Sequence, residues 1–114
     1  MKDERVYLVH IRDAILRIDA YTAPGRVEFL DNAMRQDAVL RNLHTLAEST
    51  THLSDATRTA HPEIAWRAVA GLRNVIVHDY LGVDLDRIWT IVEDDLPQLK
   101  AAVTALLESL PPLD

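Results

Sequence analysis

Residues 73–80 of the chain read Arg-Asn-Val-Ile-Val-His-Asp-Tyr. Apolar residues recur at helical intervals through this stretch and before it, at Ala65, Val69, Leu72 and Ile76. Their spacings of four, three and four predict an amphipathic helix that begins near residue 64 and keeps one stripe in a core. The rest of the fold is expected to pack around this helix.

The polar residues of the stretch lie off the apolar stripe. A helix turns by about 100° per residue, so Arg73 and Tyr80 fall on one face while Asn74 and His78 share a neighbouring face. A guanidinium, an amide, an imidazole and a phenol are therefore expected to gather near one end of the helix.

The segments that precede this helix also have a helical period. Residues 5–21 place Leu8, Ile11, Ile15 and Ile18 on one stripe, and Pro24-Gly25 ends that helix. Residues 26–32 predict a short helix or a turn, and residues 34–53 predict a longer helix. Residues 54–60 are rich in hydroxyls and precede His61-Pro62, so a linker is expected there.

The segments that follow predict two more helices. Gly82 is expected to end the central helix, and Asp84 to cap one whose apolar stripe is Leu85, Ile88, Trp89 and Val92. Pro97 should break or kink that helix, and Asp94 or Asp95 is expected to cap a new helix after the break. The residues of that helix expected to face the core are Leu99, Val103, Leu106 and Leu107. No long segment alternates as a strand would. The sequence thus predicts one all-α domain over residues 1–114, a bundle of four main helices with a short extra helix.

Composition narrows the classes of function. A chain of 114 residues can bury one core but is too short for a deep private pocket, so a site is expected to need a second copy. The chain has no Cys, which excludes disulfides, thiol catalysis and thiolate metal sites. A net charge of −6 argues against polyanion binding over the whole surface, so any nucleic-acid contact must be local. No apolar run predicts a membrane span or a secretory signal, and a cytoplasmic location is expected.

The polar residues of 73–80 admit two interpretations. Taken singly, an Arg on a helix is usually a solvated charge, and a His among apolar residues is usually a packing residue. Taken together they suit RNA cleavage, in which the 2′-hydroxyl is an internal nucleophile. His78 can move the protons, and Arg73 can grip the phosphate through two parallel hydrogen bonds. Asn74 can orient the His or donate to the phosphate, and Tyr80 can do the same or accept a nucleotidyl group.

Cleavage needs two proton transfers, and one copy supplies one His in this stretch. Two copies about a two-fold axis would supply two, and would join two Arg73 side chains in one groove. We therefore expect a homodimer. Arg41 and Asn42 are ordinarily surface and core-edge residues, but in such a dimer they could line the same cleft.

No metal site and no cofactor are expected. The other histidines have no metal-ligand spacing with one another or with carboxylates four residues away; they are His10, His44, His52 and His61. Trp66 and Trp89 are interpreted as core or interface packing residues, not as platforms for base stacking.

The pattern Arg-polar-x3-His-x-Tyr at 73–80 resembles the signature of HEPN-domain ribonuclease toxins of the HepT family. The phrases at 61–67, 71–73, 80–84 and 93–97 and the segment 36–43 are similar as well, so the resemblance covers nearly the whole chain. It implies an antiparallel HEPN-like bundle that forms a dimer. It also implies metal-independent RNA cleavage with Arg73 and His78 as the catalytic pair and Asn74 in support.

The same resemblance implies a partner. In HepT systems the toxin is neutralised by an MntA-like nucleotidyltransferase antitoxin, which attaches AMP to the Tyr of the motif, here Tyr80. An alternative from another class is a non-catalytic subunit that binds nucleotide or substrate for a nucleotidyltransferase, with Arg73 and His78 only gripping phosphate. A third is a purely structural dimeric bundle. The leading hypothesis remains a toxin that cleaves RNA, with tRNA as one candidate substrate.

Overall fold

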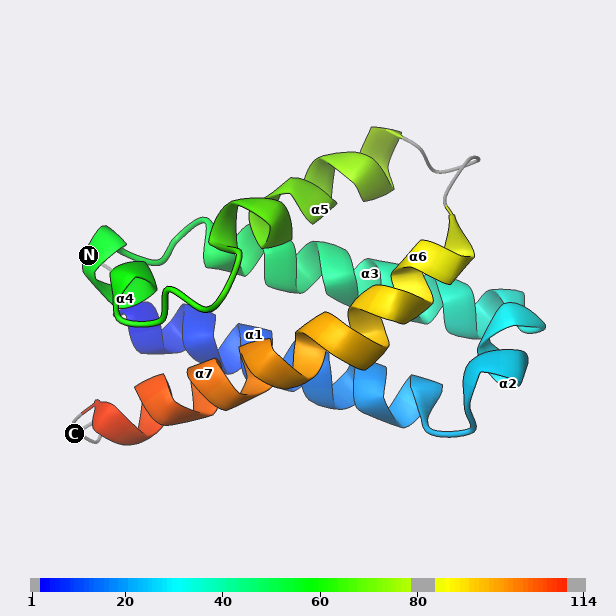
Figure 1. The fold of residues 1–114 in the computed structure, drawn as a ribbon, viewed down its shortest axis with the longest axis horizontal. Helices are drawn as coiled ribbons and strands as arrows, with labels where there is room; N and C mark the ends of the chain where they lie inside the picture. The colour runs from blue at the N-terminus through cyan, green and yellow to red at the C-terminus, as the bar shows by residue number, and fades with distance from the viewer. Residues whose placement is uncertain (1–2, 79–83, 111–114) are drawn as a thin grey trace.

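The computed structural model describes residues 3–78 and 84–110, without the side chains of residues 75–78. The long helical segments are α1 (Glu4–Thr22), α3 (Ala33–Thr50), α5 (Trp66–His78) and the continuous run α6 (Leu85–Thr90), η1 (Ile91–Asp95) and α7 (Leu96–Ser109). Successive long segments run in opposite directions, and the short helices α2 (Arg26–Leu30) and α4 (Asp55–Thr59) lie at opposite ends of the bundle (Figure 1). The described residues contain no strand, which confirms the predicted all-α class.

Helices α1 and α3 form the centre of the bundle. Asp3 caps α1 by accepting a hydrogen bond from the backbone N–H of Arg5 at 2.9 Å. Asn32 caps α3 in the same way: its side-chain oxygen accepts a hydrogen bond from the backbone N–H of Arg35 at 3.1 Å. Between them the chain turns at Gly25, whose φ of 106° favours glycine. The predicted helices at 5–21, 26–32 and 34–53 are confirmed, although α3 ends at Thr50.

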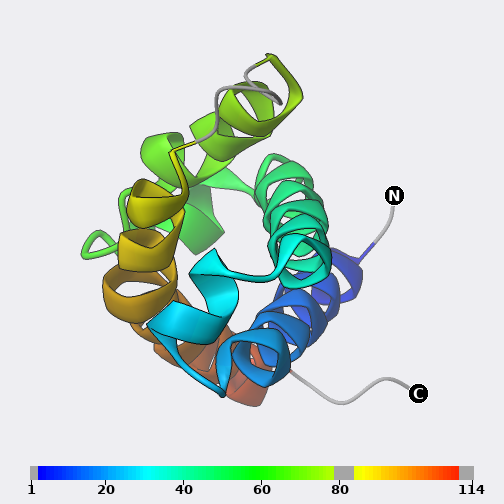
Figure 2. The ribbon, with the colours of Figure 1, turned by 90° about the vertical axis from the view of Figure 1, so that its right-hand side faces the viewer.

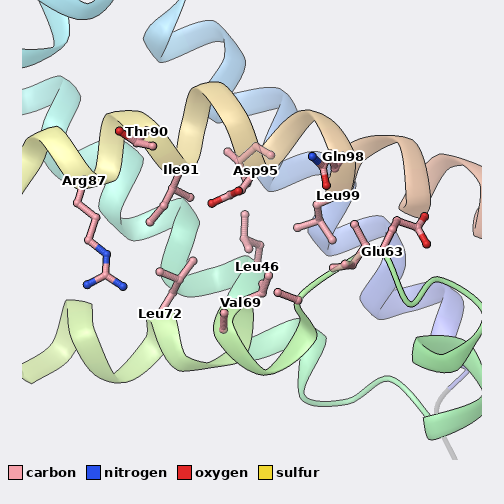
Figure 3. Close-up of a pocket in the computed structure, with 14 residues that line it drawn as sticks. Leu46, Glu63, Val69, Leu72, Arg87, Thr90, Ile91, Asp95, Gln98 and Leu99 are labelled. Carbon is pink, nitrogen blue, oxygen red and sulfur yellow. The ribbon is translucent and has the colours of Figure 1, made fainter.

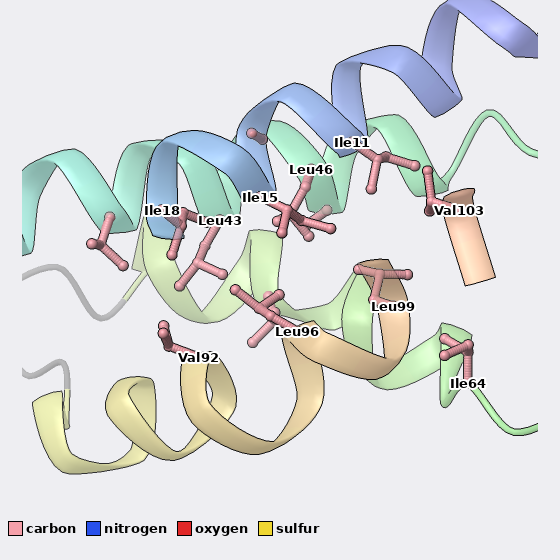
Figure 4. Close-up of a cluster of buried hydrophobic side chains, with 14 of the residues drawn as sticks. Ile11, Ile15, Ile18, Leu43, Leu46, Ile64, Val92, Leu96, Leu99 and Val103 are labelled. Carbon is pink, nitrogen blue, oxygen red and sulfur yellow. The ribbon is translucent and has the colours of Figure 1, made fainter. Parts of the chain in front are cut away.

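The apolar stripes of these helices meet in one core. Ile11, Ile15 and Ile18 of α1 face Leu43 and Leu46 of α3, and the C-terminal run covers them with Val92, Leu96, Leu99 and Val103 (Figure 4). Viewed along the bundle, α1 lies between α3 and α7 while α5 sits beside α3 (Figure 2). Each fully buried side chain of this size contributes about 1.5–3 kcal/mol.

The restart predicted near Pro97 is present as helix α7, which begins at Leu96, although the chain stays helical across the junction. The chain takes a π-helical turn from Ile91 to Asp95, in which the N–H of Leu96 donates to the carbonyl of Ile91. Pro97 then stands in the first turn of α7, where a missing N–H costs little. Asp95 precedes α7, but its side chain makes no capping hydrogen bond, so the predicted carboxylate cap is absent there. Asp84 does cap α6 as predicted.

The expected linker at 54–60 is wrong in one respect, because it contains helix α4. Ser54 caps this helix through a hydrogen bond from the N–H of Thr57 at 3.2 Å. The Glu4 carboxylate accepts from the backbone N–H of Ser54 and from the hydroxyl of Thr57. These bonds tie α4 to the beginning of α1.

Helix α5 begins at Trp66, two residues later than expected. The Trp66 indole donates to the carbonyls of Arg58 at 2.9 Å and His61 at 3.0 Å, which fixes the entry to the helix. Leu72 is buried as predicted, whereas Ala65 is exposed and does not belong to the inward stripe. Within the described part of the chain, α5 packs mainly against α3. None of the described helices has the length and apolar character needed to cross a membrane.

Candidate active site

Arg73 lies on the part of α5 that faces α3. Its Nη1 donates a hydrogen bond to Oε2 of Glu48 at 2.7 Å. The two side chains are 40% and 45% exposed, so the pair is open to solvent and to a ligand. The predicted phosphate-binding cation is therefore at the surface, paired with a carboxylate from another helix.

The other predicted residues of the motif are described only in part. Asn74 is exposed on the same helix, one residue after Arg73. The backbone of α5 stays helical through His78, so positions 74 and 78 remain one helical turn apart as predicted. The side chain of His78 and the whole of Tyr80 lie outside the described residues. Their roles stay predictions.

Glu48 connects Arg73 to a row of aromatic side chains. Its other carboxylate oxygen lies 3.7 Å from Nε2 of His52, and the His52 ring stacks on Tyr7 with centroids 4.4 Å apart and planes at 12°. The hydrogen bond from Arg73 is the main reason that the pKa of Glu48 is lowered; partial burial opposes this, and the charges of Arg73, His52 and His44 add to it. The carboxylate is thus ionised at neutral pH.

The two α3 residues that were proposed as possible cleft residues differ in their surroundings. Arg41 is exposed, and it precedes Glu48 by seven residues, or about two helical turns on the same face. Helices α3 and α5 run in opposite directions (Figure 1). Because Glu48 pairs with Arg73, the part of α3 that precedes Glu48, including Arg41, lies toward the C-terminal end of α5. Asn42 is buried, and its Nδ2 donates to the Ala38 carbonyl at 2.8 Å.

A cavity of about 340 Å³ opens on another side of α5, between this helix and the C-terminal run (Figure 3). Leu46, Val69, Leu72, Ile91, Leu96 and Leu99 supply most of its apolar lining. Arg87 points from α6 toward α5, and Asp95 of the π-helical turn points into the space (Figure 3). Arg73 does not line this cavity, so the two features are separate.

The two tryptophans are packing residues, as predicted. Both lie against the core, and the Trp89 ring is 5.7 Å from that of Phe29. Among the residues described, no group of three His, Asp or Glu side chains could hold a metal ion.

The sequence interpretation missed Glu48. It is one of few charges on α3 after Asp37, and it lies 25 residues before Arg73 in the chain. The only carboxylate in the second half of α3 and the predicted catalytic cation on α5 could have suggested the pair. The cavity could not be foreseen, because it depends on how far α5 stands from the C-terminal run.

Comparisons with known proteins point to one family. A family model described as "Ribonuclease HepT-like" matches residues 11–106. A "Probable ribonuclease HepT" of Thermococcus cleftensis is 35% identical over 100 residues, which cover 87% of this chain and 91% of that protein. No solved structure matches the chain.

Two further relatives have similar names. A "Gamma-glutamylcyclotransferase and putative RNase" of Methanocaldococcus jannaschii is 33% identical over 96% of this chain, which spans only 50% of that longer protein. A "Putative RNase" of Caldanaerobacter subterraneus subsp. tengcongensis is 28% identical over 95% of this chain and 97% of its own length.

Proposed function

The chain belongs to the HepT-like ribonuclease family, and on that basis we propose that it is a metal-independent endoribonuclease and the toxin of a toxin–antitoxin pair. The observation that carries the proposal is the position of Arg73. Its guanidinium is 40% exposed and is held by Glu48, on the helix that ends at His78. A fixed, accessible guanidinium is the group that a reaction at phosphorus requires.

In the proposed reaction the RNA supplies its own nucleophile. The 2′-hydroxyl gives its proton to the imidazole of His78 and attacks the neighbouring phosphorus, while the bond to the 5′-oxygen of the next nucleotide breaks. A second imidazole gives that leaving oxygen a proton. The products are a 2′,3′-cyclic phosphate and a 5′-hydroxyl. Arg73 stabilises the extra negative charge on the phosphoryl oxygens, and Asn74 is the supporting polar group.

The second imidazole comes from a second copy of the chain. We propose that two copies form a homodimer in which the ends of their α5 helices meet at one cleft. Arg41 is exposed and lies toward that end of α5, so it is proposed to extend the cationic surface for RNA. Light scattering should report a dimer under the conditions of cleavage. A monodisperse monomer that cleaves RNA would refute this part.

The test of the enzymatic proposal is cleavage of a tRNA pool by purified protein in EDTA. Arg73→Ala and His78→Ala should both abolish cleavage. Arg67→Ala is a matched control, because Arg67 is exposed and lies outside the motif; it should cleave as the native protein does. If the native protein binds RNA and never cuts it, the alternative of a non-catalytic binding subunit replaces the enzyme.

Neutralisation by a nucleotidyltransferase is the second part of the proposal. We propose that an MntA-like antitoxin attaches AMP to the phenol of Tyr80, which adds a bulky anionic group to the motif that contains Arg73. Co-expression with an MntA-like nucleotidyltransferase should raise the intact mass by whole AMP units. Tyr80→Phe should remove the increment and leave the toxin active. An increment that persists in Tyr80→Phe would refute the assignment.

A further inference from the structure

Among the described residues, Glu48 is the one that hydrogen-bonds to the Arg73 side chain, and it comes from a different helix. We infer that Glu48 is a positioning residue, which holds the Arg73 guanidinium with its remaining N–H donors directed at the phosphate of the RNA. This inference rests on the proposed function. It concerns a residue outside the 73–80 motif, in α3.

Glu48 is itself held in place. It lies within α3, between Ala47 and Ser49, which are both buried. Its Oε1 faces His52 at 3.7 Å while its Oε2 accepts from Arg73 at 2.7 Å, so each oxygen has its own partner. The His52 ring is in turn stacked on Tyr7 of α1. A chain of contacts from α1 through α3 thus reaches the guanidinium on α5.

The geometry of the pair leaves room for a phosphate. A guanidinium has five N–H donors, and two of them suffice for a bidentate bond to phosphate. Glu48 takes a hydrogen bond from Nη1 alone. Within the described residues Arg73 has no other partner, so Nε and Nη2 remain available. Carboxylate and phosphate can therefore bind the same guanidinium together, and Glu48 does not need to leave when RNA arrives.

This arrangement predicts which kinetic constant depends on Glu48. An Arg that is charged but poorly oriented still attracts RNA, so KM should change little. The transition state requires the exact placement of the donors, so kcat should fall. A misplacement of about 1 Å can reduce a rate on the order of 100-fold. If Glu48 instead covered Arg73 against RNA, its removal would lower KM and raise the rate.

The experiment compares Glu48→Ala and Glu48→Gln with a matched control. Asp19 accepts a hydrogen bond from Lys100 at 3.0 Å, with side chains 46% and 43% exposed, so Asp19→Ala removes a surface pair of the same kind elsewhere. Glu48→Ala should lower kcat roughly 10- to 100-fold with KM within about threefold. Glu48→Gln keeps an acceptor for Nη1 and should recover part of the loss. Asp19→Ala should leave both constants unchanged.

A second readout does not depend on activity. Nitrogen-15 NMR of the arginine side chains should show slow rotation of the Arg73 guanidinium in the native protein and fast rotation in Glu48→Ala. Unchanged kcat in Glu48→Ala, or a lower KM, would overturn the inference. The inference would also be overturned if the Arg73 guanidinium rotated as fast in the native protein as in Glu48→Ala. If native protein fails to cleave RNA while NMR still shows that Glu48 restrains Arg73, the proposed ribonuclease function fails and the positioning contact stands.

Discussion

Arg73→Lys tests whether the site needs the shape of a guanidinium or only its charge. Lysine keeps the positive charge, but its ammonium is a point charge that cannot offer a planar pair of parallel donors. In the native protein Nη1 is bound to Glu48 at 2.7 Å, and within the described residues the other two nitrogens have no hydrogen-bond partner. A lysine ammonium has to serve Glu48 and phosphate from one nitrogen.

The expected loss follows from this count of donors. At least one hydrogen bond to the developing charge disappears, and removal of one such donor costs on the order of 100- to 1,000-fold in kcat, or about 2.7–4 kcal/mol. The long-range attraction of RNA to a cation is retained, so KM should change by less than about fivefold. Arg73→Ala removes this attraction as well as the hydrogen bonds, so it should not cleave even at low salt, where the attraction of RNA to cations is strongest.

The assay is single-turnover cleavage of an end-labelled tRNA pool in EDTA, with enzyme in excess and its concentration varied. Arg67→Lys is the matched control, since Arg67 is exposed on the same helix and has no described ion pair. Circular dichroism and a thermal midpoint close to that of the control confirm that Arg73→Lys is folded. The cleavage rate at saturating enzyme and the enzyme concentration that gives half of this rate are determined separately.

One result would refute the reasoning. If Arg73→Lys cleaves within about threefold of the native rate while Arg73→Ala is inactive, charge alone suffices and bidentate binding by Arg73 is wrong.

Three further predictions concern stability. Leu43→Ala removes a side chain that is 0% exposed, and should lower the free energy of unfolding in urea by about 2–5 kcal/mol, whereas Leu16→Ala, at 46% exposed, should change it by about 0.5 kcal/mol or less. Asp84→Ala loses the cap bonds from the N–H groups of Asp86 at 3.1 Å and Arg87 at 3.3 Å, and should cost about 1 kcal/mol; Asp84→Asn should restore most of it. Because Arg73 lowers the folded-state pKa of Glu48 below its usual 4.5, stability from this pair is present above that pH and lost as the pH falls through the folded value. The urea concentration at the unfolding midpoint should therefore fall less steeply between about pH 5 and pH 3 in Glu48→Gln than in the native protein. Equal slopes for the two proteins would contradict this.

The sequence predicted the positions of the helices correctly where the apolar residues of a helix form one stripe that packs into the core. Leu8, Ile11, Ile15 and Ile18 recur at the helical period, and all four are buried in α1. The cap at Asp84 was readable for the same reason, since it depends on the hydrogen bonds of the next two or three residues. Helical periodicity and capping depend on residues within one or two helical turns of each other, and these residues are adjacent in the sequence.

The misreadings arose where a second segment decides the outcome. The hydroxyl-rich residues at 54–60 form a helix because Glu4, about fifty residues earlier, accepts hydrogen bonds at its beginning. The partner of Arg73 was missed in the same way, since no pattern within α5 reveals Glu48. Each case depends on a contact between segments that the sequence does not order in space.

The one-sided support of α5 has a consequence for its dynamics. Over its described residues, the helix that carries Arg73 packs mainly against α3, and a cavity lies along the side that faces the C-terminal run. Segments with few buried contacts open at lower free energy than a fully enclosed helix does. Amide hydrogens of α5 should accordingly exchange with deuterium sooner than those of α1 and α3. The bundle would then combine two slow-exchanging helices with a more labile one, and the labile helix is the one proposed to contact RNA.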